Sequence, residues 1–282
     1  MTREFIGARN GWAKSPTTCV PIGAWRNGAS SSRIWATRGG DGEANVGAHP
    51  PYSEHIRRFL KANTFLGRLP EAALGTLMER GHLRQYAKRD IIYRRGAPGD
   101  SLMVVLKGRV KLSNVNVSGK EIVLHFLVPG DIYGEIAAMD GGERVANAVA
   151  LEDSEIFLIY TRDLMPTLKA HPDAMLEIIR VLCEKVRLGA ALIEDSTLEM
   201  RGRIARGLQR LAKHHGRRSD QGTCVQLALS HAELGNYLGL SRANVSRQLG
   251  QLREANVIKI EGAQIVILDA DGLAEIAALS KD

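Results

Sequence analysis

The stretch "LSHAELGNYLGLSRANVSRQLGQL", residues 229–252, predicts two short helices joined by a tight turn. Ser230 is a favourable N-cap, and Glu233 three residues later completes a capping box at the start of the first helix. Gly239 supplies the conformational freedom that a tight turn between two helices needs. Ser241 then caps the second helix.

The apolar residues of this stretch recur at helical spacing, so we expect them to form a core shared by the two helices: Leu234, Leu238, Leu240, Val245, Leu249 and Leu252. The other face of the second helix begins with polar or small residues that suit the major groove of DNA. There, Arg reads guanine and Asn reads adenine through paired hydrogen bonds. The predicted DNA-binding residues are Ser230, His231, Ser241, Arg242, Ala243, Asn244, Ser246 and Arg247. The alternative is an ordinary helical hairpin with solvated arginines.

The residues after this stretch, "NVIKIEGAQIVIL" (256–268), predict a β-hairpin that turns at Glu261 and Gly262 and ends the last segment of the chain. The chain has 282 residues and a net charge of +7, and the basic excess lies in residues 1–40 and 201–282. A basic C-terminal domain indicates nucleic acid as a partner.

Upstream, residues 171–200 read as one long helix with apolar residues at alternating spacings of four and three. This heptad seam consists of Met175, Ile179, Leu182, Val186, Gly189 and Ile193. Such a seam favours pairing with a second copy of the helix. The alternative is a helix that packs on its own domain.

The region from residue 83 to about residue 160 is a series of short β-branched or aliphatic runs separated by Gly, Asp and Pro. This pattern predicts a β-sandwich or small barrel, preceded by helical residues 51–81. Residues 1–50 are rich in Gly, Ser, Arg and Ala without periodicity. We interpret them as a disordered basic extension or a misassigned start, with a DNA-contacting arm as the alternative.

Several classes of function find no support in the sequence. No apolar run approaches the roughly 18 residues that span a bilayer, and the N-terminus has no apolar signal-peptide core. The cysteines Cys19, Cys183 and Cys224 are widely separated and show no metal-site spacing, which predicts a reducing cytoplasm and no metal. Because no nucleophile elbow, phosphate-binding loop or paired catalytic carboxylates occur, we expect no enzyme and no catalytic residues.

The ordered run "PGD…KGRVKL…GKEIVLHFLVPGDIYGEIA…ERVA", the long helix, "GRIARGL" and the helix-turn-helix stretch resemble the CRP/FNR family of bacterial transcription regulators over residues 55–270. The resemblance implies an α+β architecture, with an N-terminal double-stranded β-helix (β-roll) sensor, a long dimerisation helix and a C-terminal winged helix-turn-helix. The implied domains are 51–170, 171–200 and 201–282. It further implies a homodimer on palindromic double-stranded DNA, with RNA polymerase as a further partner.

In this family, the segment matching "YGEIAAMDGGERVANA" (133–148) holds the phosphate and ribose of a cyclic nucleotide. The residues carried over are Gly134, Glu135, Ile136, Arg144, Val145 and Ala146. Their chemistry fits: backbone N–H groups at a helix start bind anions, Arg144 offers a planar fork to a phosphate, and Glu135 can accept a ribose hydroxyl. Cyclic AMP is the expected effector, and no other cofactor is required.

Four positions depart from the family pattern. Val145 stands where a cyclic-AMP receptor of the family has a serine, and Leu188 and Gly189 stand on the long helix where that receptor reads the adenine. Ala243 replaces a frequent glutamate in the recognition helix, which predicts a half-site different from the family's TGTGA-like core.

These departures leave other functions open. One is a regulator of the same architecture that is constitutive, partner-gated or redox-gated through Cys183. A more remote one is a cyclic-nucleotide-binding subunit of an enzyme. The remaining alternative for Glu135 and Arg144 is a structural ion pair, and His125 reads as a lone packed or surface histidine rather than a haem ligand.

Overall fold

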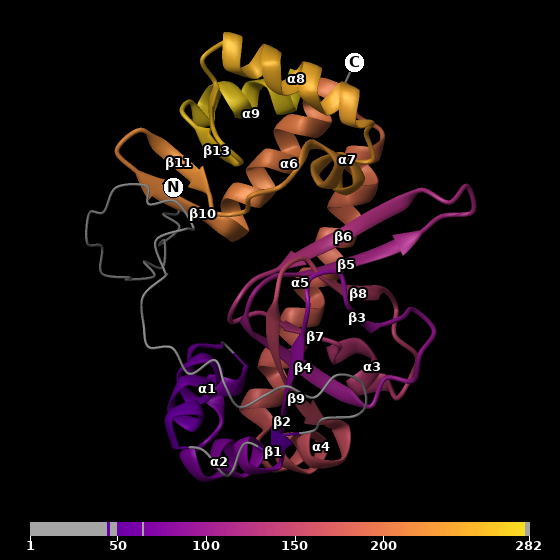
Figure 1. The fold of residues 1–282 in the computed structure, drawn as a ribbon, viewed down its shortest axis with the longest axis vertical. Helices are drawn as coiled ribbons and strands as arrows, with labels where there is room; N and C mark the ends of the chain where they lie inside the picture. Colours follow the sequence, from indigo (N-terminus) through magenta and orange to yellow (C-terminus); the bar gives the residue numbers. More distant parts are fainter. Residues whose placement is uncertain (1–43, 46–49, 64, 280–282) are drawn as a thin grey trace, which may run out of the picture.

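The structure is a computed structural model that describes residues 44–45, 50–63 and 65–279. The predicted extension, residues 1–50, therefore lies almost wholly outside the described residues. Figure 1 shows a β-rich sensor domain at one end, a smaller domain at the other, and the long helix α5 (Pro172–Ser196) running between them.

The sensor domain is built from two antiparallel sheets, as the β-roll prediction requires. One sheet has five strands in the order β1-β2-β9-β4-β7, and the other has four in the order β3-β8-β5-β6. The strands are β1 (Ala44–Asn45), β2 (His82–Tyr86), β3 (Ile91–Tyr93), β4 (Ser101–Lys107), β5 (Val110–Val115), β6 (Glu121–Leu127), β7 (Ile132–Tyr133), β8 (Asn147–Ala150) and β9 (Ser154–Tyr160).

Strand β4 shows why this part of the chain folds as a closed sandwich. Its sequence SLMVVLK is buried at every position except the last. Alternate side chains of a strand point to opposite faces, so a strand without polar alternation must be covered on both. Met103 and Val105 pack between the two sheets, whereas Leu102, Val104 and Leu106 pack against helices on the outer face.

The helices on that outer face are α1 (Pro50–Ala62), η3 (Leu66–Arg68), α2 (Glu71–Arg80), α4 (Thr161–Ala170) and the first half of α5. Helix α2 begins after Pro70 and ends before Gly81, within the predicted helical residues 51–81. Helix α4 was missed in the sequence because Pro166 lies in its middle, where proline normally breaks a helix.

The C-terminal domain contains a four-stranded sheet in the order β10-β11-β13-β12 and four helices. Its elements are α6 (Met200–His215), β10 (Gly216–Ser219), β11 (Gly222–Val225), α7 (His231–Leu238), α8 (Arg242–Glu254), β12 (Ile258–Glu261), β13 (Gln264–Ile267) and α9 (Ala270–Leu279). The predicted hairpin is β12–β13, but the prediction that the segment ends there is wrong. Helix α9 follows, and Leu273 and Ala277 anchor it in the domain core.

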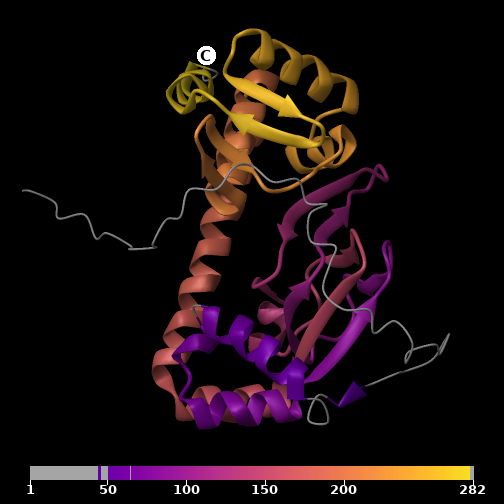
Figure 2. The same ribbon diagram turned by 60° about the vertical axis from the view of Figure 1, so that its left-hand side comes forward.

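The core of this domain contains all six apolar residues predicted from the helix-turn-helix stretch. The same cluster also includes Val123 and Phe126 of β6, a sensor strand. The β5–β6 hairpin therefore reaches out of the sensor domain and packs under the C-terminal domain. Figures 1 and 2 both show the hairpin extending to α7, with α5 as the second connection between the two domains.

Candidate functional site

Helices α7 and α8 are built as the sequence predicts. The Ser230 hydroxyl accepts a hydrogen bond from the Glu233 backbone N–H at 3.2 Å, and the Glu233 carboxylate accepts one from the Ser230 N–H at 2.8 Å. Gly239 ends α7 with φ 70°, a conformation that a side chain would strain. The Ser241 hydroxyl accepts from the Asn244 N–H at 3.2 Å and caps α8.

Helix α8 is locked on one face and open on the other. Val245, Leu249 and Leu252 are buried in the core. The opposite face of the helix is exposed at Ser241, Arg242, Ala243, Ser246 and Arg247. These five predicted DNA-binding residues therefore lie together on one side of α8. Figure 1 shows α8 at the end of the molecule far from α1 and α2.

The other three predicted DNA-binding residues are half-buried or already engaged in hydrogen bonds within the protein. Asn244 is half-buried, and its side-chain oxygen accepts a hydrogen bond from Arg247 Nη2 at 2.9 Å. An amide oxygen can accept two hydrogen bonds, so this bond does not prevent Asn244 from reading an adenine. Ser230 is exposed but engaged in the capping box, and His231 is half-buried at the start of α7.

The second predicted site lies in the sensor domain, around the short helix α3 (Glu135–Asp140). Gly134 precedes α3 with φ 80°. A Cβ at Gly134 would lie 2.4 Å from Arg144 Nη1 and 2.9 Å from the Ser101 carbonyl oxygen. Glycine is thus required twice, for its backbone angle and for the close approach of the arginine.

Arg144 is buried with an exposed fraction of 3%. Its Nη1 donates to the carbonyl oxygens of Ser101 at 2.8 Å and Gly134 at 3.1 Å, and its Nη2 donates to the Ser101 hydroxyl at 2.8 Å. The guanidinium also lies over the ring of Tyr93, 4.6 Å from its centroid. The planar fork that was predicted to hold a phosphate is therefore bound to the protein itself.

Glu135 is also buried, and its partner is a lysine on the long helix. Lys185 Nζ of α5 lies 2.7 Å from Glu135 Oε1. The alternative that Glu135 and Arg144 pair with each other is wrong, because each has a different partner. The sequence did not single out Lys185, since nothing local to α5 indicates which loop its side chain meets.

Buried polar atoms in this region still lack hydrogen-bond partners among the described residues: Glu135 Oε2, Arg144 Nε and Tyr133 Oη. Burial raises the pKa of Tyr133 well above its ordinary value, so its hydroxyl remains a neutral donor. Unsatisfied buried groups are uncommon in proteins. Their presence on neighbouring residues of the predicted site is therefore a feature that the function must explain.

The remaining predicted ligand residues differ in how deeply they are buried. Ala146 is buried and Ile136 is half-buried, but Val145 is 52% exposed and points away from the enclosed part of the site. Leu188 and Gly189 on α5 are half-buried. They follow Lys185 by three and four residues, which places them one turn along the same helix face.

The exposed apolar stripe of α5 differs in part from the predicted seam. Ile179, Val186 and Ile193 are exposed as expected, the last two at 72% and 71%. Met175 and Leu182, however, pack on the sensor core, and Gly189 is half-buried. The exposed stripe is completed by Leu176, Cys183 and Ala190, which again alternate by three and four residues. Cys183 therefore lies on the stripe rather than beside it.

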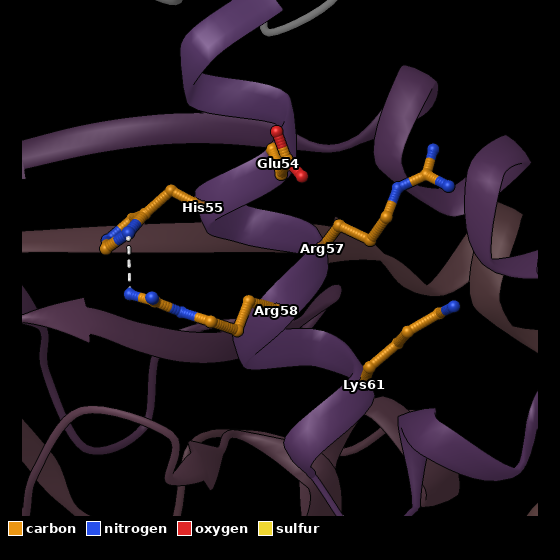
Figure 3. A pocket seen from close by; sticks show the side chains of 5 residues that line it. All are labelled: Glu54, His55, Arg57, Arg58 and Lys61. Carbon is orange, nitrogen blue, oxygen red and sulfur yellow. Dashed lines mark hydrogen bonds between the residues drawn. The ribbon is translucent and has the colours of Figure 1, made fainter.

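A shallow pocket of about 510 Å³ lies beside α1 and is lined by Glu54, His55, Arg57, Arg58 and Lys61. Figure 3 shows these side chains radiating from one helix: Arg57 and Lys61 point one way, and His55 and Arg58 the other. Arg57 and Lys61 both pair with Glu71 of α2, so this surface does not present a converging set of ligand groups.

Within the described part of the chain, none of the helices combines the length and apolarity that crossing a membrane requires. Nor does any group of three or more His, Cys, Asp or Glu side chains among those residues have the arrangement of a metal site.

Comparison with known proteins agrees with this architecture. The family model for the cyclic nucleotide-binding domain matches residues 83–171, and the model for the Crp-like helix-turn-helix domain matches residues 202–276. The cyclic AMP receptor protein of Thermus thermophilus is 30% identical over 195 residues, which are 69% of this chain and 87% of that protein.

Solved structures give the same result. TTHB099, a CRP-family transcriptional regulator from Thermus thermophilus, is 27% identical with a TM-score of 0.56, over 69% of this chain and 96% of that one. FixK2 from Bradyrhizobium japonicum shares the fold, with a TM-score of 0.63 at 21% identity, over 70% of this chain and 96% of that one. The chain therefore belongs to the CRP/FNR family of transcription regulators.

Proposed function

We propose that the protein is a homodimeric transcription regulator that binds palindromic DNA through α8 and a cyclic nucleotide, with cyclic AMP favoured, in its sensor domain. The observation that carries DNA binding is the exposed face of α8. Arg242, Ser246 and Arg247 share this face, while the opposite face is fixed in the domain core. A rigid helix that presents arginines at its start suits the major groove.

The dimer is supported by α5. Its stripe of exposed apolar residues runs most of the length of a 25-residue helix. Apolar side chains at alternating spacings of three and four are typical of a coiled-coil seam, and a second copy of α5 would cover them. Two copies would then present two α8 helices to the halves of one palindromic site.

Cyclic-nucleotide binding is supported by the groups around α3. Glu135 Oε2 is a buried acceptor for a ribose hydroxyl, and Arg144 Nε and Tyr133 Oη are buried donors for a phosphate. The relative from Thermus thermophilus is named a cyclic AMP receptor protein, which agrees with this ligand class. A nucleotide that binds better to one arrangement of the domains would shift the protein toward it.

The test is calorimetric titration of the purified dimer with cyclic AMP, with and without operator DNA. Arg144→Ala is expected to abolish the response, but this change also removes the hydrogen bonds to Ser101 and Gly134. Glu135→Gln keeps the shape of the side chain and an acceptor oxygen, but it removes the charge that also pairs with Lys185. A hydrogen bond to a charged group is stronger than a neutral one by about 1 kcal/mol, so we expect roughly fivefold weaker binding.

The matched ligand control is 2′-deoxy cyclic AMP. It should bind the wild-type protein more weakly than cyclic AMP, and Glu135→Gln should distinguish the two ligands less strongly than the wild type does. Equal binding of both ligands to the wild-type protein would contradict the assignment of Glu135 to the ribose.

A second function rests on a specific observation: the charged groups that would bind the nucleotide already bind other groups of the protein. Lys185 pairs with Glu135, and the Nη atoms of Arg144 bind Ser101 and Gly134. This favours a regulator of the same architecture without a cyclic nucleotide, gated by a partner protein or by oxidation of Cys183. Titration of cyclic AMP and cyclic GMP without heat, and DNA binding unchanged by either, would support it. Loss of an oxidant response in Cys183→Ser would identify the redox version.

A further inference from the structure

Three histidines meet where the sensor domain contacts the C-terminal domain. His125 lies on β6 of the sensor, and His214 and His215 lie at the end of α6. The ring centroid of His125 is 6.2 Å from that of His214 and 6.2 Å from that of His215, and the last two are 6.3 Å apart. His125 is therefore not the lone histidine that the sequence indicated.

The surrounding contacts show that this is where one domain docks on the other. The ring of Phe126 on β6 lies 5.6 Å from that of Tyr237 on α7. Asn236 Nδ2 donates to Glu121 Oε2 at 2.9 Å, and Lys120 Nζ donates to the carbonyl oxygen of Gly239 at 3.1 Å. The β5–β6 hairpin thus holds the first helix and the turn of the helix-turn-helix.

The charged groups that face the histidines are mostly cations. On helix α5, the charge of Lys185 lowers the pKa of His125, and the charge of Glu184 raises the pKa of His214. On helix α6, the charges of Lys213 and Arg210 lower the pKa of His214. Only Glu184 among these groups would favour added positive charge. His215 Nδ1 is also buried without a hydrogen-bond partner among the described residues.

We propose that the three-histidine cluster is a pH-sensitive latch, in which protonation of the histidines releases the C-terminal domain from the β5–β6 hairpin. Three imidazolium groups at these separations would repel one another and the neighbouring lysines. Separating β6 from α6 relieves the repulsion between His125 and the two histidines of α6, and it exposes the rings to water. The device goes beyond ligand and DNA binding, because it acts on the contact between the domains.

The direction of the effect follows from linkage. Burial first, and then Lys185 and the other histidines, lower the pKa of His125 from 6.5 to about 3. Burial and His214 lower the pKa of His215 to about 4. Since the docked form binds fewer protons, docking is favoured above the ordinary pKa of 6.5 and is lost as the pH falls below it. At pH 5.5 each of these two histidines disfavours docking about tenfold, and together about a hundredfold.

The carboxylate at the contact titrates at lower pH. Burial works to raise the pKa of Glu121, but hydrogen bonds from Lys111, Ser113 and Asn236 outweigh it and hold that pKa below its ordinary value. Glu121 therefore keeps its charge and its bond to Asn236 between pH 7.5 and 5.5. A change of docking between these two pH values therefore reflects protonation of the histidines and not of Glu121.

The test measures a distance within one protomer of the full chain, without DNA or nucleotide, by pulsed electron resonance. Spin labels are placed at Val117→Cys, in the turn between β5 and β6, and at Ala263→Cys, in the turn between β12 and β13. The background carries Cys19→Ser and Cys183→Ser, and Cys224 is buried and does not react. Mixing with excess unlabelled protein leaves one labelled protomer per dimer.

At pH 7.5 we expect one narrow distribution of distances, that of the docked form. At pH 5.5 we expect a second, broader distribution from the undocked form. The ratio of docked to undocked protein should fall by up to about a hundredfold between the two pH values. His125→Gln and His215→Gln should each reduce this shift about tenfold. The double variant should remove most of it and leave only the contribution of His214, whose pKa is also lowered by burial. His55→Gln on α1 is the control and should behave as wild type.

Two results would overturn the latch: identical distributions at both pH values in the wild-type protein, or a double variant that shifts as the wild type does. Circular dichroism at both pH values shows whether the chain stays folded, so that unfolding is separated from release. The measurement needs neither ligand nor operator, so a negative result would not contradict the proposed regulator function. Likewise, a protein that binds no cyclic nucleotide could still show the pH-dependent release.

Discussion

The two predicted binding sites place their arginines in opposite environments. Arg144 of the sensor is 3% exposed, and its fork is bound to protein oxygens. Arg242 and Arg247 of α8 are exposed at the start of a helix with no buried role. The sensor arginine therefore holds the fold together, whereas the two arginines of α8 have no such role in the fold.

The difference follows from how each site is assembled. The recognition face comes from one helix, so a single capped segment determines it. The sensor site joins α3 to Ser101, which lies 43 residues before Arg144, and to Lys185 on another helix. A site of the second kind couples ligand binding to the packing of distant elements, which is what a sensor needs.

The largest effect expected from this comparison is on stability. Arg144→Ala should lower the free energy of unfolding by about 3 kcal/mol, because it removes three buried hydrogen bonds from the guanidinium to Ser101 and Gly134. Arg242→Ala should change it by no more than about 0.5 kcal/mol, as is usual on a surface. Urea unfolding followed by circular dichroism measures both. Equal losses for the two variants would remove the distinction between the buried and the exposed arginine.

The next effect is on DNA recognition. Arg247→Ala should weaken operator binding by on the order of 1–3 kcal/mol and relax the preference at one base pair. Fluorescence anisotropy with the selected operator and its single-base variants measures both quantities. Binding should also fall steeply with salt, because contacts to phosphates release counterions.

The matched control for Arg247→Ala is Arg253→Ala, which removes an exposed arginine from the last turn of the same helix. Base contacts come from the start of a recognition helix, so the control should keep the base preference. If Arg247→Ala retains wild-type affinity and specificity, that residue does not read DNA.

The parts of the fold that the sequence predicts well are those that a few neighbouring residues determine. The capping box at Ser230, the turn at Gly239 and the hairpin turn at Gly262 each depend on one or two residues, and all three are present. The elements that were missed lack such markers. Helix α4 carries a proline, and α9 follows a hairpin that resembled the end of a domain.

The seam of α5 illustrates a different limit. The helix has apolar residues on two neighbouring stripes, and periodicity does not show which of them meets the sensor domain. Met175 and Leu182 pack on that domain, while Leu176 and Cys183, one position further along, face outward. Likewise, the pairing of Lys185 with Glu135 is a tertiary contact without a local pattern, so only the structure shows it.

The smallest effects separate a residue that caps a helix from one that contacts DNA. Ser230→Ala removes the capping box of α7 and should lower the free energy of unfolding by about 1 kcal/mol. Ser246→Ala removes an exposed hydroxyl in the first turns of α8 and should leave that energy within about 0.5 kcal/mol while weakening DNA binding. Urea unfolding and anisotropy on the same two proteins measure the contrast. If Ser230→Ala is as stable as the wild type but binds DNA poorly, the Ser230 hydroxyl contacts the DNA phosphate backbone and does not stabilise the helix. The recognition surface would then extend from α8 onto the start of α7.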